Sequence, residues 1–161
     1  MRRNISHTRN LAWLLTTVYL LVLMVPSPAF AGLGDSGNSI RNDQLSMKAT
    51  LTTIFARDYT VHTLTSSLGI VVREYVSFSG SILAVSWHGP FVPDMQRLLA
   101  KRFELYSLEV RKQNTRRFGH SAMTVRTPFL VVENVGQMRA CTGRAYDPSL
   151  LPAGVSIDEI R

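Results

Sequence analysis

The chain has 161 residues and a formal net charge of +7, from 18 lysines and arginines against 11 aspartates and glutamates. Its length is that of one domain with a sizeable core, and the lack of any internal repeat excludes a solenoid. Because Cys141 is the only cysteine, an intramolecular disulfide is excluded and stability must come from packing.

The first 31 residues carry the features of a secretory signal peptide in their usual order. Arg2, Arg3 and Arg9 make a positive start, and an apolar run follows from Leu11 to Val25. Small residues at 29 and 31, either side of Phe30, then resemble a cleavage site. The apolar run is shorter than the roughly 17–25 residues of a spanning helix, so we expect cleavage rather than a retained anchor. The sequence therefore predicts export through the general secretory route, to the periplasm or the extracellular space.

A linker and a helix are predicted next. Residues 32–38 are glycine-rich and polar, so we expect a flexible linker before a single domain at 39–161. Apolar residues recur at loosely helical spacing from Ser39 to about Leu51, and this spacing predicts a short helix there.

The centre of the domain predicts strands followed by a helix. Three runs rich in β-branched and aromatic residues lie at 59–65, 70–77 and 82–87. Their short connections predict a three-stranded antiparallel meander. Pro93-Asp94 suits a first helical turn, and an apolar stripe at three- and four-residue spacing predicts an amphipathic helix from about 94 to 109.

The last third carries a basic run and more strands. Residues 111–126 hold no carboxylate and no sustained apolar period, so we expect a loop or, in part, an irregular edge strand. Runs at 129–135 and 137–146 predict a C-terminal hairpin, and 156–161 a terminal turn. The predicted fold class is α+β: a small antiparallel sheet, a meander of three strands plus a C-terminal hairpin, packed against one long amphipathic helix.

One candidate binding surface is the corner between the third strand and the long helix. Trp87, His88 and Phe91 lie there beside Pro90 and Pro93, which restrict the backbone and favour a rigid, aromatic-lined groove. The alternative is that the two aromatic side chains close the end of the core.

A second candidate surface is the basic run, which would attract an anionic envelope polymer or an acidic surface of another envelope protein. Its alternative is a solvated loop that keeps the domain soluble. The cationic residues at this surface are Arg111, Lys112, Arg116 and Arg117.

Catalytic and metal-binding motifs are absent. The histidines beyond the leader, His62, His88 and His120, lack the close spacing of zinc ligands, and no nucleophile elbow, phosphate loop or dinucleotide fingerprint occurs. Glu74, beside Arg73, suggests an exposed cross-strand charge partner. We expect no metal, no cofactor, no nucleic acid partner and no membrane span after signal cleavage.

Two alternatives to a binding role stay open. The first is a small envelope hydrolase that uses His62 or His88 as its base. The second is a subunit of a larger secreted assembly, because Cys141 can be buried or can pair with another chain. The oligomeric state is not determined by the sequence.

A family likeness rests on three segments, YTVHTLTSSLGIVVREYVS at 59–77, ILAVSWHGPFVPDMQRLL at 82–99 and GRAYDPSLLPAGVS at 143–156. They resemble a family of exported bacterial proteins catalogued as domain of unknown function 2844. The resemblance covers roughly residues 32–160 together with the signal peptide. It implies export and one small domain, and it supplies no catalytic residue. We therefore expect a non-enzymatic periplasmic domain that acts as a binding or accessory module of the bacterial envelope.

Overall fold

The structure, a computed structural model, describes residues 32–37, 40–114, 122–137 and 139–161. The signal peptide expected at 1–31 lies outside these ranges. The strands are β1 (Ala49–Phe55), β2 (Tyr59–Ser66), β3 (Val71–Ser77), β4 (Ile82–Gly89), β5 (Ala122–Thr127), β6 (Leu130–Gln137) and β7 (Ala140–Tyr146). The helical segments are α2 (Ile40–Met47), α3 (Met95–Leu99), the 3₁₀ turn η2 (Ala100–Arg102), α4 (Phe103–Asn114) and the 3₁₀ turn η3 (Ile157–Glu159).

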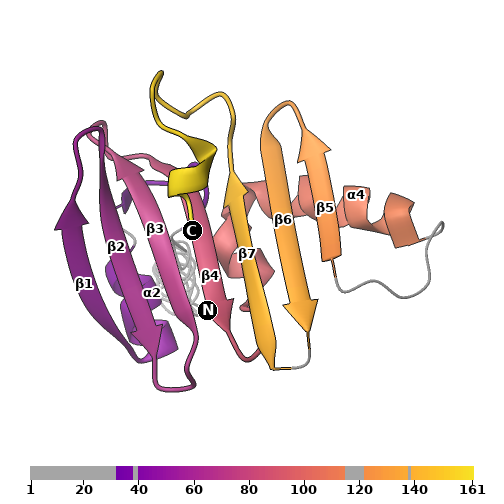
Figure 1. Cartoon of the computed structure of the whole chain (residues 1–161), viewed down its shortest axis with the longest axis horizontal. Helices are drawn as coiled ribbons and strands as arrows, with labels where there is room; N and C mark the ends of the chain where they lie inside the picture. Colours follow the sequence, from indigo (N-terminus) through magenta and orange to yellow (C-terminus); the bar gives the residue numbers. More distant parts are fainter. Residues whose placement is uncertain (1–31, 38–39, 115–121, 138) are drawn as a thin grey trace, which may run out of the picture.

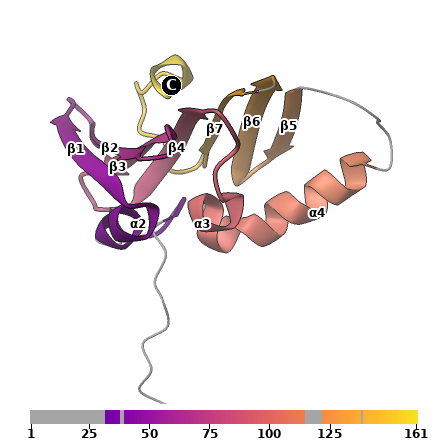
Figure 2. The same ribbon diagram turned by 90° about the horizontal axis from the view of Figure 1, so that it is seen from below.

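All seven strands form one antiparallel sheet with the order β1-β2-β3-β4-β7-β6-β5 (Figure 1). The sheet has two halves, each a helical segment followed by its own meander: α2 with β1–β4, and α3–α4 with β5–β7. The halves join where β4 pairs with β7, from Ala84↔Tyr146 to Gly89↔Cys141. Figure 2 shows the helices of both halves on one face of the sheet and the C-terminal segment on the other.

The first half corrects the prediction of a helix from Ser39 to Leu51. Helix α2 stops at Met47, because Lys48 adopts a left-handed backbone conformation (φ 48°) that a helix cannot continue. The next residues, ATLTTIF, are mostly β-branched or aromatic and form β1 instead. The predicted three-stranded meander is therefore a four-stranded one.

The second half corrects the predicted helix at 94–109 and the predicted hairpin. Asp94 caps α3, since its Oδ1 accepts the backbone N–H groups of Gln96 and Arg97. The helix is then interrupted at Ala100 (φ 43°), and α4 continues to Asn114. Because β5 adds to the predicted hairpin, the C-terminal strands form a three-stranded meander. The α+β class with an antiparallel sheet is confirmed, whereas the predicted number of strands is wrong.

The segment at 32–37 is packed into the fold, in contrast to the flexible linker expected at 32–38. Leu33 is buried, and its N–H donates to the carbonyl of Leu98. The N–H of Gly34 donates to the carbonyl of Ile82, and Ser36 forms a β-bridge with Ser81. Residue 38 lies outside the described ranges.

Two apolar cores lie on the two faces of the sheet. The larger one fills the space between helices and sheet, with Leu64, Val85 and Leu99 among its fully buried members. The smaller one lies under the C-terminal segment, where Ile160 packs with Tyr59, Tyr75 and Tyr146. The C-terminal segment is therefore an integral part of the fold.

Candidate functional site

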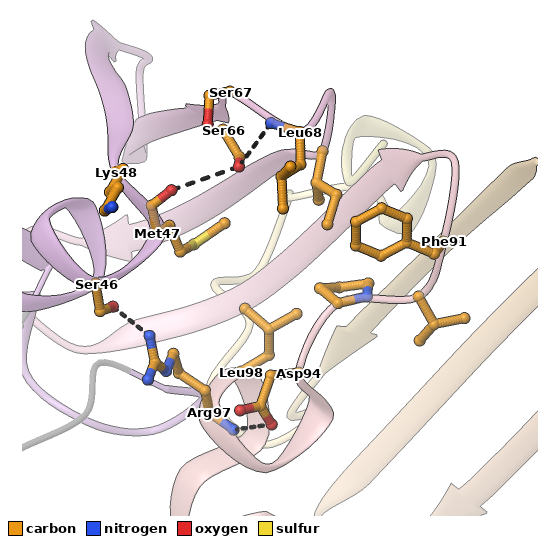
Figure 3. A pocket seen from close by; sticks show the side chains of 13 residues that line it. Ser46, Met47, Lys48, Ser66, Ser67, Leu68, Phe91, Asp94, Arg97 and Leu98 are labelled. Atoms are coloured by element: carbon orange, nitrogen blue, oxygen red, sulfur yellow. Dashed lines mark hydrogen bonds between the residues drawn. The ribbon is translucent and has the colours of Figure 1, made fainter.

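A groove of about 490 Å³ lies on the helix-bearing face of the sheet (Figure 3). The C-terminal end of α2, the β2–β3 turn, the β4–α3 connection and α3 form its walls. This volume is within the usual range of small-ligand sites.

Glycines allow the walls of the groove to approach each other. Gly69 in the β2–β3 turn has a φ of 82°, which side-chain-bearing residues rarely adopt. Gly89 ends β4 so close to this turn that an added Cβ would lie 3.0 Å from the Cα of Ile70. The strand-to-helix corner and the β2–β3 turn are thus held together by backbone contact.

The interior of the groove is mainly apolar. Phe91, 45% exposed, lines it from the β4–α3 connection, and the exposed side chain of Leu68 lines it from the β2–β3 turn. Met47 and Leu98 come from α2 and α3 (Figure 3). An apolar group can therefore bury surface between elements that are far apart in sequence.

Cationic side chains lie at the end of the groove nearest α2. Lys48 is exposed and forms no ion pair within the described part of the chain. Arg97 donates from Nη1 to the hydroxyl of Ser46, so its guanidinium is held beside α2. The one carboxylate that lines the groove, Asp94, accepts two backbone N–H groups at the start of α3. The groove therefore favours an apolar ligand that carries a negative charge.

The corner residues expected to bind a ligand are placed in three different environments. Trp87 is buried, and an added Cβ at Gly143 would lie only 2.3 Å from its ring, so the indole packs directly against β7 at Gly143. His88 points to the opposite face of the sheet, where its Nδ1 lies 2.9 Å from the hydroxyl oxygen of Thr142. Phe91 alone of the three lines the groove.

The basic run is divided by the fold. Arg111 is exposed at the end of α4, whereas Lys112 pairs with Glu109 (Nζ–Oε1 2.6 Å). Arg116 and Arg117 lie outside the described residues. At its other end, Arg126 pairs with Glu133 on β6 (Nη2–Oε1 2.9 Å). Carboxylates from outside the run thus neutralise two of its charges.

Sequence reasoning missed a buried carboxyl group on β3. The predicted exposure of Glu74 is wrong, because its side chain is fully buried and neither oxygen has a hydrogen-bond partner within the described residues. Burial, and then the nearby charge of Asp43 on α2, raise the pKa of Glu74 to about 8. The alternation of Val72, Glu74 and Val76, which places all three on the helix-bearing face, was the signal that could have revealed it.

The histidines proposed as catalytic bases bond threonines rather than serines. His62 lies opposite Glu74 in the register of β2 and β3, and its Nδ1 lies 3.0 Å from the hydroxyl oxygen of Thr53. Burial lowers the pKa of His62. His62 and His88 occupy opposite faces of the sheet, and neither lines the groove. They cannot act together on a ligand held there.

Three further observations concern Cys141, metals and membrane crossing. Cys141 is half-buried, without a disulfide. Among the residues that the structure describes, no three metal-ligating side chains come together. Within the same ranges, no helix has the length and apolar character needed to cross a membrane.

Comparison with known proteins places the chain in a family. The family model described as "Protein of unknown function (DUF2844)" matches residues 29–160, and the chain belongs to this family. No curated protein and no solved structure matches it.

Proposed function

We propose that this member of the DUF2844 family is a non-enzymatic binding module of the bacterial envelope and that the groove beside Phe91 is its binding site. The features of residues 1–31 support export through the general secretory route to the periplasm. The groove of about 490 Å³ is the observation that carries the binding role.

The chemistry of the groove indicates the class of partner. Apolar side chains from two adjoining segments, Leu68 and Phe91, can hold one or two large apolar side chains of another protein. Lys48 and Arg97 at one end attract a carboxylate beside them. We therefore infer that the ligand is an apolar peptide segment of another envelope protein with an acidic group at one end.

A binding role fits the structure better than the alternative of a hydrolase. A hydrolytic site needs a nucleophile and a base within hydrogen-bond reach. The two candidate bases bond Thr53 and Thr142 on neighbouring strands, and both lie away from the groove. The groove itself offers serine hydroxyls without a histidine beside them.

The binding role can be tested with 8-anilinonaphthalene-1-sulfonate, an apolar aromatic probe that carries one negative charge. We expect the probe to bind, and Phe91→Ala to weaken its binding about tenfold, as the loss of one buried phenyl group predicts. Phe78→Ala is the matched control, because Phe78 is 70% exposed in the β3–β4 turn outside the groove. Equal probe affinities for the two variants would contradict the assignment of the groove.

The charged end of the groove can be tested separately. Lys48→Gln should weaken binding of the same probe about threefold at low salt and change little at high salt, because exposed charges are screened. Lys112→Gln on α4 is the matched control. An effect of Lys48→Gln that is independent of salt would contradict the electrostatic part of the proposal.

Export is tested by expressing the full chain in a bacterial host. We expect the protein in the periplasmic fraction with a mass that corresponds to a start at Gly32. A full-length chain held in the membrane fraction would contradict signal cleavage.

A further inference from the structure

The strand β1 forms one edge of the sheet and is bonded on one side only. It pairs with β2 over its whole length, from Ala49↔Ser66 to Phe55↔Thr60. The N–H of Ala56 donates to the carbonyl of Tyr59 (2.9 Å), so position 56 bonds toward β2. Because bonding direction alternates along an antiparallel strand, the N–H and C=O groups of residues 49, 51, 53 and 55 point away from the sheet.

The opposite edge of the sheet is protected, whereas β1 is not. On β5, the side chain of Gln113 donates to the outward carbonyl of Thr124 (2.9 Å), and Arg126 adds a charge to the strand. The sequence of β1, ATLTTIF, contains no charge and no proline, and its register with β2 has no bulge. Within the described residues nothing bonds its outward groups. Natural proteins usually blunt such an edge, because it is a template for another strand.

Apolar side chains flank this open edge on both faces of the sheet. Phe55, 80% exposed, lies on the helix-bearing face, and Ile54, 60% exposed, lies on the other. Leu45 on the neighbouring helix α2 is exposed as well. A strand added to β1 would therefore remove both unbonded backbone groups and apolar surface from water.

We propose that β1 pairs antiparallel with β1 of a second copy of this chain, about a two-fold axis at Thr52. In this register the outward groups of Ala49 face those of Phe55 in the other copy, and Leu51 faces Thr53. All four outward positions are then bonded, and the sheets of the two copies become one.

The ends of the pair favour a second copy over an unrelated strand. The large side chain of Phe55 meets the small side chain of Ala49, next to α2 of the other copy, where Leu45 is exposed. The β1–β2 turn of one copy, which holds Arg57 and Asp58, lies at the same end of the pair as Lys48 of the other copy, so Asp58 offers an unlike charge to Lys48 at both ends. Asp58 and Lys48 have no ion-pair partner within the described ranges of their own chain.

Sedimentation velocity of the protein as isolated from a bacterial host, across a wide concentration range, tests the proposal. We expect a monomer–dimer equilibrium that Thr52→Lys weakens about fivefold or more, because the axis places the two lysines directly opposite each other. Thr52→Glu should weaken it as well, and an equimolar mixture of the two variants should dimerise again. Thr124→Lys on β5 is the matched control and should leave the equilibrium unchanged.

Several outcomes would overturn the proposal. They are a monomer at every concentration, an association that Thr124→Lys weakens and Thr52→Lys does not, and a mixture of the charged variants that stays monomeric. Circular dichroism of each variant confirms that the sheet is intact, since Thr52 and Thr124 are both exposed edge positions. Dimerisation can fail while the groove still binds the probe, so this test is independent of the proposed function.

Discussion

The two halves of the sheet follow the same plan of a helix and a meander, and they differ in how their buried carboxyl groups are bonded. Asp147, directly after β7, is fully buried, and Arg102 and the N–H and Oγ of Ser149 donate to it. Glu74 on β3 is equally buried and has no hydrogen-bond donor among the described residues. Asp147 is part of an ion pair with Arg102, whereas Glu74 is buried most favourably in its neutral form.

The same difference appears at the two edges of the sheet. The second half covers its edge with Gln113 and Arg126, whereas β1 in the first half presents uncharged, unbonded backbone. The groove lies between the halves, lined by α2 and the β2–β3 turn of the first half and by the β4–α3 connection and α3. We infer that the β5 edge of the second half is closed and that the β1 edge of the first half is open to another molecule.

The largest expected effect comes from breaking the ion pair of the second half. Asp147→Asn leaves the partly buried Arg102 without its carboxylate, and we expect the free energy of unfolding to fall by roughly 3–5 kcal/mol. The same carboxyl-to-amide change at the unbonded Glu74 should cost far less at pH 7. Urea unfolding of both variants measures the difference, and equal losses would contradict the contrast between the two sites.

A smaller effect is expected from Glu74, which makes the free energy of unfolding depend on pH. Its folded-state pKa of about 8 exceeds the usual value of 4.5, so the folded state holds a proton that the unfolded state has released between these values. The contribution of Glu74 to the free energy of unfolding is therefore fully present below about pH 4.5 and is lost as the pH rises through 8. The loss is on the order of a few kcal/mol.

Chemical unfolding of the native protein and of Glu74→Gln from pH 5 to 9 tests this expectation. The free energy of unfolding of the native protein should fall as the pH rises, and Glu74→Gln should remove that fall. Among the described residues, Asp43 on α2 and His62 on β2 are titratable groups that also face Glu74. Burial lowers the pKa of His62, so the folded state binds this proton less readily than the unfolded state. His62 therefore lowers the free energy of unfolding as the pH falls, at the acid end of the range, whereas Glu74 lowers it as the pH rises. Glu104→Gln, at an exposed position, is the control. A variant with the same decline as the native protein would show that Glu74 is not its source.

The smallest expected effect concerns the covered edge. Gln113→Ala removes one side-chain hydrogen bond to the carbonyl of Thr124, which should cost about 1 kcal/mol or less. Thermal unfolding measures this cost, and the sedimentation behaviour should not change because Arg126 still protects β5. A new association in this variant would show that Gln113 alone had kept the second edge closed.

Most strands could be predicted from sequence, because β2, β3, β4 and β6 carry runs of β-branched, aromatic and other apolar residues bounded by turns. The strand β1 was missed because Ile40, Leu45, Met47 and Leu51 continue a helical spacing across the junction at Lys48. The backbone conformation of Lys48 separates the two elements, and the β-branched and aromatic residues of ATLTTIF were the sequence signal for a strand.

The groove could be predicted only in part. The corner at Phe91 supplies one wall and is visible in the sequence through its two prolines. The adjoining wall at Leu68 and the charged end at Lys48 and Arg97 come from segments that only the fold brings together. The protection of one edge by Gln113 likewise depends on how α4 packs against β5.

Residue-resolved amide hydrogen exchange at low and high protein concentration tests the contrast between the two edges most directly. We predict that the outward amides of Leu51, Thr53 and Phe55 exchange quickly in dilute solution and become protected as the concentration rises. The amides of Thr52, bonded to β2, and Thr124, on the opposite edge, should not change with concentration. Protection that appears at Thr124 instead, or at neither edge, would contradict the assignment of β1 as the interacting edge.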